Sequence, residues 1–342
     1  MNKLNNGKNC NIFFLNFLIL LMFISLFSCQ SKETVVVYTS LDQIYSEPIL
    51  KEFEKKTGIT VKAVYDTETA KTVGLVNKII AEKDNPQCDV FWNNEFLRTI
   101  VLKEKGILTP YNSPSASDIP KEFRDTEGYW TGFAARTRVI IYNTELVDSS
   151  DAPQSIFDLV DSKWKGEVGI ANPLFGTTSS HVAALYLAFG KTKARDYLLK
   201  LKANKTRVFD GNAVVKNMVG DGEVKVGLTD SDDANIGLEQ KKPIAIVFPD
   251  QDSLGTFFIP NTVSLIKNCP HPDAGMKLID YLLSSEVEKK LSKSLSKQIP
   301  LRKGLEFPDI VPENLVYMEI DYQECAALIE STAVEVKEIF LK

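Results

Sequence analysis

The chain has 342 residues, with 45 acidic and 40 basic side chains, so its formal net charge is −5 at pH 7. An acidic balance without basic clusters argues against a nucleic acid as partner. The chain has 2 histidines and no CxxC pair among its 5 cysteines, which argues against a histidine-rich metal site, a thiolate zinc site and a disulfide framework. This length suffices for two lobes, each with a core of its own.

The first thirty residues have the pattern of an export signal. Lys3 and Lys8 supply positive charge, and residues 12–27 are nearly all apolar. This run is too short for a comfortable membrane span and is typical of a secretory signal. It ends in an LFSC sequence that resembles a bacterial lipobox. We therefore expect residues 1–28 to be a lipoprotein signal peptide and Cys29 to carry the lipid, with an uncleaved membrane anchor as the alternative. Either way, the body is exported.

The body alternates strand and helix patterns in chain order. Apolar runs predict strands at 34–38, 59–65, 89–92, 167–171, 207–210, 225–228 and 244–248. Helical spacing predicts helices at 44–57, 73–80, 95–104, 177–189 and 192–204 and a further one through Val214 and Met218. Such alternation indicates an α/β fold with parallel sheets and helices on both faces.

Two longer extended stretches interrupt this alternation. Residues 132–143 and 255–266 are each about twice a typical strand length. We expect them to cross between two doubly wound lobes and to bend when a cleft closes. Lobe 1 is predicted to comprise 29–134 plus 262–308, and lobe 2 to comprise 135–261 plus 309–342. A single long strand in one large sheet is the alternative.

Polar residues follow most of the predicted strands, where ligands bind in open α/β sheets. Helix capping explains any one of these loops, but their recurrence favours a polar cleft. The candidate ligand-binding residues, including one on the first long stretch, are Ser40, Asp42, Asn93, Asn94, Glu95, Arg136, Asn172, Gly176, Thr177, Thr178, Asp230, Asp232 and Asp233.

The segment 176–180 (GTTSS) predicts a helix start that binds an anion. Its N–H groups, its hydroxyls and the helix dipole would act together. The alternative is a well-capped helix with solvated hydroxyls. The segment lacks the GKS or GKT ending of a Walker loop.

The segment 229–233 (TDSDD) places three carboxylates within four residues. Such a cluster is costly unless it meets a cation or caps the following helix. In the functional interpretation, the three carboxylates bind a cation, an amine or sugar hydroxyls. The spacing is not that of an EF-hand.

Arg136 and Arg138 lie two apart on the first long stretch and therefore on one face. Each can meet an anionic ligand bidentately or form a salt bridge at the hinge, and both interpretations stay open. Trp92 and Tyr38 are predicted to pack in the core.

These segments resemble extracellular solute-binding proteins of the ferric-iron ABC-transporter type, in the class II periplasmic binding protein superfamily. The resemblance covers nearly the whole body, in VVVYTSLDQIYSEPILKEFEKKTGI, CDVFWNNE, YWTGFAARTRVIIYN, ANPLFGTTSSHVAAL, GLTDSDD, FPDQ, LGTFFIPNTVSLI and SKQIPLR. It implies ABC permease and ATPase partners and a monomer. Together with the expected lipidation of Cys29, we expect a lipid-anchored location in the periplasm or on the outer face of the cell membrane.

The resemblance also implies a ligand set. In ferric-binding relatives, two adjacent tyrosines, a histidine, a glutamate and a synergistic anion hold the metal. Asp42 stands about where the histidine would be, Asn94 or Glu95 where the glutamate would be, and residues 229–233 replace the tyrosine pair. The anion-binding helix start matches as Gly176, Thr177 and Thr178. The metal ligands implied in this way are Asp42, Glu95, Asp230 and Asp232.

We therefore expect a substrate-binding lipoprotein of an ABC importer that takes ferric iron or an iron–anion complex, with no cofactor required. A receptor for an organic phosphate, phosphonate or carboxylate is the alternative. An exported hydrolase with paired aspartates is less favoured, because G-x-S-x-G and histidine-rich metal motifs are absent from the sequence. A sensor or adhesion module is a third hypothesis.

Overall fold

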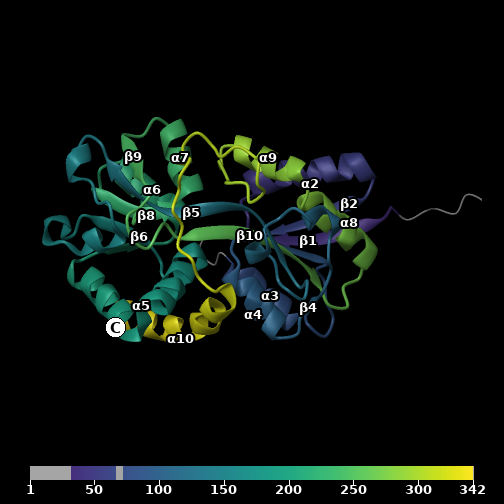
Figure 1. Ribbon diagram of the computed structural model, residues 1–342. Helices are drawn as coiled ribbons and strands as arrows, with labels where there is room; N and C mark the ends of the chain where they lie inside the picture. Colours follow the sequence, from purple (N-terminus) through teal and green to yellow (C-terminus); the bar gives the residue numbers. More distant parts are fainter. Residues whose placement is uncertain (1–31, 67–71, 342) are drawn as a thin grey trace, which may run out of the picture. The chain divides into compact units, whose positions relative to one another are not determined.

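Two long strands, β5 (Thr131–Asn143) and β10 (Phe258–Ile266), pair antiparallel in the middle of the sheet, as Figure 1 shows. The computed structural model describes residues 32–66 and 72–341. The predicted signal peptide and Cys29 lie outside these residues. Within them, the stretch predicted at 132–143 is one continuous strand, whereas of the stretch predicted at 255–266 only residues 258–266 form a strand. Both strands are fully buried, because each is flanked by partners on both sides.

The strands are ordered β2-β1-β3-β10-β5-β8-β6-β7, with β4 also pairing β10 and β9 also pairing β5. On one side β1 is parallel to β2 and β3, and on the other β6 is parallel to β7 and β8. The strands are β1 (Thr34–Thr39), β2 (Thr60–Tyr65), β3 (Val90–Asn93), β4 (Leu108–Thr109), β6 (Val168–Ala171), β7 (Arg207–Phe209), β8 (Val226–Asp230) and β9 (Ile244–Val247). Two parallel groups joined by antiparallel crossing strands confirm the predicted two-lobed α/β fold.

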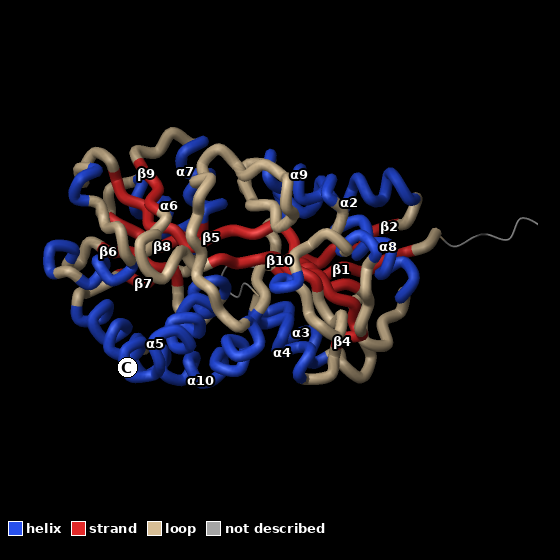
Figure 2. Tube along the Cα trace, in the orientation of Figure 1, coloured by secondary structure: helices blue, strands red, loops and turns tan. Residues whose placement is uncertain are grey.

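Helices lie on both sides of the strands in Figure 2. They are α2 (Gln43–Thr57), α3 (Val73–Ala81), α4 (Leu97–Glu104), α5 (Gly176–Ala203), α6 (Asn212–Gly220), α7 (Ser231–Glu239), α8 (Pro272–Leu282), α9 (Ser285–Lys293) and α10 (Tyr322–Phe340). Short 3₁₀ helices lie in the connections at Pro114–Ala116, Lys121–Phe123, Ser149–Asp151, Ile156–Val160 and Ser162–Trp164. The two helices predicted at 177–189 and 192–204 form α5, which is kinked at Gly190, where φ is 74° and ψ is 163°. Glycine tolerates this non-helical conformation.

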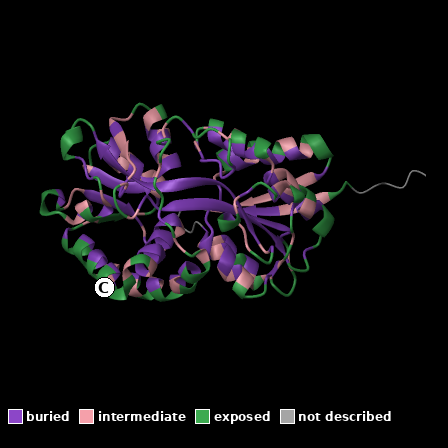
Figure 3. Ribbon diagram, viewed as in Figure 1, coloured by how far each residue is buried: buried purple, intermediate pink, exposed green. Residues whose placement is uncertain are grey.

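The strands form the buried centre of the structure, drawn purple in Figure 3. Trp92 and Tyr38 are buried in the first of two large apolar clusters, which confirms their predicted core role. The second cluster joins α5 and α10 and also takes in Phe96 and Leu97 from the start of α4. The described residues from Thr34 onward form one compact unit. The lobe boundaries given above therefore stay a prediction.

The crossing strands contain a local irregularity where they meet. Ala134 on β5 has a φ of 40°, and the register of β10 shifts between Pro260 and Asn261. The Asn261 amide donates to the carbonyl of Phe133 and to that of Ala134. A non-glycine residue at positive φ is uncommon and is held here by its surroundings. Among the described residues, no helix has both the length and the apolar character needed to cross a bilayer.

Candidate functional site

A small cavity of about 30 Å³ lies at the N-terminus of α5. It collects residues that follow β3, β6, β7 and β8 and one residue of β5. The lining residues are Asn94, Arg136, Ala171, Asn172, Phe175, Gly176, Thr177, Thr178, Asp210, Gly211, Asn212, Asp230, Asp232 and Asp233. This placement beyond the carboxyl ends of parallel strands is the usual one for ligand sites in α/β folds. The volume has room for a group the size of a water molecule or an ion.

The start of α5 forms one wall of the cavity. Gly176 begins the helix with a φ of 53°, and the first-turn N–H groups of a helix have no intrahelical acceptor. Thr178 is 4% exposed, and its hydroxyl has no hydrogen-bond partner among the described residues. Unsatisfied buried hydroxyls are rare and call for an explanation such as a ligand or an ordered water. The wall therefore offers free donors to an anionic group.

Three carboxylates form the facing wall. One oxygen from each of Asp230, Asp232 and Asp233 lies within 4.8 Å of the others, and the first two residues are buried. Asp230 accepts hydrogen bonds from the Thr177 hydroxyl at 2.7 Å and from the Asn212 amide at 3.0 Å. The Asp232 carboxylate accepts a hydrogen bond from the backbone N–H of Asp233. Asp230 is thus firmly held by its neighbours.

Two arginines of β5 meet this acidic wall. Arg138 is fully buried, and its guanidinium donates to Asp230 at 2.6 Å and to the Leu228 carbonyl at 3.2 Å. Burial opposes ionisation of Asp230, but Arg138 and Arg136 outweigh it and lower the pKa of that carboxyl. The hinge salt bridge that was one interpretation of Arg138 is therefore present. Arg138 does not line the cavity.

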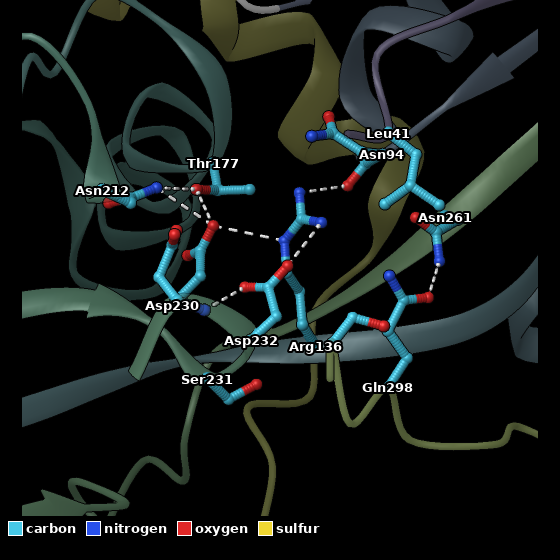
Figure 4. A network of polar contacts seen from close by, with 12 residues as sticks. Leu41, Asn94, Arg136, Thr177, Asn212, Asp230, Ser231, Asp232, Asn261 and Gln298 are labelled. Carbon is cyan, nitrogen blue, oxygen red and sulfur yellow. Dashed lines mark hydrogen bonds and ion pairs between the residues drawn. The ribbon is translucent and has the colours of Figure 1, made fainter. Parts of the chain in front are cut away.

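Arg136 does line the cavity, and Figure 4 shows its guanidinium between three partners. Its Nη2 donates to the carbonyl of Asn94 at 2.7 Å, its Nε lies 3.2 Å from Asp230, and its Nη1 lies 3.5 Å from Asp232. Burial opposes its charge, but the carboxylates, Asp232 first, raise the pKa of Arg136. Asn94 follows β3, whereas Asp230 ends β8 and Asp232 lies just after it. Arg136 therefore links the two groups of strands.

The predicted residues Ser40, Asp42, Asn93 and Glu95 do not line the cavity. Ser40 donates to the side chains of Asn93 and Asn94. Asp42 lies at the N-cap position of α2. Glu95 is fully buried, and its carboxylate accepts hydrogen bonds from the backbone N–H groups of Leu97 and Arg98 and from the Ser180 hydroxyl.

Of the implied metal ligands, the structure thus brings Asp230 and Asp232 together, whereas Glu95 and Asp42 are not among the residues that line the cavity. Glu95 accepts hydrogen bonds from backbone N–H groups at the N-terminus of α4 and, through Ser180, connects α4 to α5. Capping residues and ligand residues have the same composition at a strand end, so the sequence does not separate these two roles.

Several lining residues were not among the predicted ones. Asp210 and Gly211 lie in a polar loop after β7, and Asn212 begins α6. Their position directly after a predicted strand is the sequence feature that could have identified them. Ala171 and Phe175 are apolar, and nothing in the sequence marks them as site residues.

Residues 49–314 match the family model of bacterial extracellular solute-binding proteins. The chain belongs to this family. Among curated relatives, it is 26% identical over 284 residues to Iron uptake protein A1 of Synechocystis sp., covering 80% of this chain and 77% of the relative. It is 29% identical over 297 residues to a putative 2-aminoethylphosphonate-binding periplasmic protein of Salmonella typhimurium, covering 83% and 82%.

Solved structures agree with this family. Iron-bound HitA from Pseudomonas aeruginosa superposes with a TM-score of 0.80 at 26% identity, covering 89% of this chain and 99% of that one. AfuA from Actinobacillus pleuropneumoniae, with fructose-6-phosphate bound, superposes with a TM-score of 0.79 at 25% identity, covering 90% and 99%. The solute-binding fold is thus shared by proteins whose names and titles carry different ligands.

Proposed function

We propose that this chain is the substrate-binding subunit of an ABC importer and works with a permease and an ATPase. Its family membership supports a binding role without catalysis. We further propose that residues 1–28 direct export, that Cys29 carries a lipid anchor at the outer face of the cell membrane or in the periplasm, and that the protein acts as a monomer. The two lobes (29–134 plus 262–308, and 135–261 plus 309–342) would close over the ligand.

The observation that carries the proposed ligand is the two-sided cavity, with helix-start donors facing three carboxylates. We propose ferric iron bound together with an anion. Carboxylate oxygens are hard donors suited to Fe³⁺, and Asp232 and Asp233 line the cavity beside Asp230, which is paired with both arginines. The anion would lie against Gly176, Thr177 and Thr178. Iron-binding relatives support this assignment.

A second candidate is an organic phosphate or phosphonate. No tyrosine lies among the residues that line the cavity, and two arginines already engage the carboxylates. A phosphonate group suits the start of α5, and an amine suits Asp232 and Asp233. The relative named for 2-aminoethylphosphonate and the structure with fructose-6-phosphate support this candidate.

Thermal unfolding of the purified protein with each ligand separates the candidates. Ferric citrate, citrate, inorganic phosphate, fructose-6-phosphate and 2-aminoethylphosphonate would be compared at equal concentration. A ligand at a hundredfold excess over Kd stabilises the folded state by about 2.7 kcal/mol. Iron is supported if ferric citrate raises Tm and citrate alone does not. A shift with 2-aminoethylphosphonate alone would replace iron by the second candidate, and no shift with any ligand would overturn both.

A further inference from the structure

The guanidinium of Arg136 occupies the place where a cation bound to the acidic wall would lie. It contacts Asp230 and Asp232 at 3.2 and 3.5 Å while it is itself 3% exposed (Figure 4). Three carboxylates within 4.8 Å repel one another unless a positive charge is present. Arg136 supplies that charge from the protein. A metal ion bound to the same oxygens would have to displace it.

Arg136 and Arg138 differ in how tightly they are fixed. Arg138 is held by Asp230, by the Leu228 carbonyl and by the Asn212 side chain, away from the cavity. Arg136 is held by one hydrogen bond to the Asn94 carbonyl, by the 3.2 Å ion pair with Asp230 and by the longer 3.5 Å contact to Asp232. The contact between Arg136 and Asp232 is therefore the one that an entering ligand can open at least cost.

We infer that Arg136 is the specificity-determining residue of this site: it acts as an internal cation that excludes bare metal ions and requires the ligand to bring an anionic group. A ligand anion at the start of α5 can pair with the guanidinium, because both line the same small cavity. Iron would then enter only as an iron–anion complex. This inference rests on the proposed function and names the class of ligand that the site accepts.

Tb³⁺ luminescence measures the predicted exclusion, because Tb³⁺ is a trivalent cation that prefers carboxylate oxygens. Arg136→Gln removes the charge and keeps a polar side chain of moderate length. We expect this variant to bind Tb³⁺ at least tenfold more tightly than the unmodified protein and to bind 2-aminoethylphosphonate or phosphate at least tenfold more weakly. Arg207→Gln, at an exposed arginine outside the cavity, is the matched control and should change neither.

A second variant does not depend on the folding of the first. Asp232→Asn keeps the size of the side chain and releases Arg136 from its weaker partner. We expect it to bind inorganic phosphate, which brings neither a metal nor an amine to Asp232, severalfold more tightly and to cancel the Tb³⁺ gain when combined with Arg136→Gln. Unchanged Tb³⁺ affinity in a folded Arg136→Gln variant, or unchanged affinity for inorganic phosphate in Asp232→Asn, would overturn the inference.

These outcomes are distinct from failure of the proposed function. If the unmodified protein binds none of the ligands tested by thermal unfolding, the proposed ligand fails whatever Tb³⁺ does. If it binds one of them and the variants change nothing, the role of Arg136 fails while the receptor role stands.

Discussion

The carboxylate of Glu288 on α9 accepts a hydrogen bond of 2.8 Å from the backbone N–H of Ala134, where β5 has a φ of 40°. The same carboxylate accepts from the backbone N–H of Leu301 at 2.9 Å and from the Arg302 guanidinium at 2.7 Å. Glu288 and Arg302 are both buried, so each compensates the charge of the other. One side chain of α9 therefore holds the irregular part of a crossing strand.

Removal of the Glu288 carboxylate should destabilise the protein strongly. Glu288→Ala leaves the Arg302 charge buried without its main partner and frees the backbone N–H of Ala134, so we expect a loss of about 3–5 kcal/mol in the free energy of unfolding. Urea unfolding measures this loss. Glu286→Ala, two residues away on α9 and half exposed, should cost less than about 1 kcal/mol. Equal losses in the two variants would contradict the assigned role of Glu288.

Replacement of Thr178 should separate binding from stability. Thr178→Val keeps the shape of the side chain and removes a buried hydroxyl that has no partner among the described residues. We expect stability to stay within about 0.5 kcal/mol, whereas affinity for the anionic ligand should fall about tenfold through loss of one hydrogen bond. Calorimetric titration measures the affinity.

Thr206→Val provides the control for this prediction, because its hydroxyl is also without a partner among the described residues but lies outside the cavity. It should leave affinity unchanged. The idea that the Thr178 hydroxyl contacts ligand fails if the two variants bind alike.

Arg138→Met should unfold more readily than the unmodified protein. The substitution removes the 2.6 Å ion pair with buried Asp230, and a broken buried pair costs about 3–5 kcal/mol. Chemical denaturation measures the loss. Arg207→Met, at an exposed arginine, should stay within about 0.5 kcal/mol. A small loss in Arg138→Met would mean that Arg136 alone suffices to neutralise Asp230.

Acid should destabilise the protein through His181. This buried ring stacks on Phe257 with 5.0 Å between centroids, and burial, with a contribution from Arg138, lowers the pKa of His181 to about 3. Because the unfolded chain protonates His181 near pH 6.5, its contribution is complete above that pH and is lost as pH falls from there toward 3. The loss is at most about 1.4 kcal/mol per pH unit.

Urea unfolding at several values between pH 7.5 and 4.5 measures this dependence. His181→Phe should have a shallower decrease in the free energy of unfolding than the unmodified protein, because phenylalanine keeps the stack and binds no proton. Identical pH dependence in the two proteins would show that His181 does not contribute.

Local patterns predict the strands and most helices of the two lobes, because strand and helix periodicities reflect burial on particular faces. The long strands β5 and β10 were predictable from the length of their extended runs. The kink of α5 at Gly190 joins two predicted helices, and spacing alone does not show whether a glycine ends a helix or bends it. The helices α8, α9 and α10 were not predicted.

The part of the candidate site that lies at the ends of strands was predictable from the sequence. Thr177, Asp230 and Asp232 meet because β6 and β8 are adjacent parallel strands. The different surroundings of Arg136 and Arg138 were not predictable, because their spacing places both on one face of the strand. Their partners depend on the register of β5 and β8, in which Arg138 lies opposite Asp230. Likewise, the role of Glu95 depends on the start of α5, which lies far along the chain.

The packing of α10 determines how much of the chain must be synthesised before the native packing can form. This helix contacts both α4 and α5 and buries Cys325, Ile329 and Val336 in the second apolar cluster. The strands of the first group likewise lack their central partner until β10 has been made. A nascent chain that stops before residue 258 thus lacks both β10, which pairs with the first group of strands, and α10, which covers the second apolar cluster. A chain that stops before α10 leaves the second cluster exposed. Native packing throughout the molecule is therefore expected only after nearly the entire polypeptide has been synthesised.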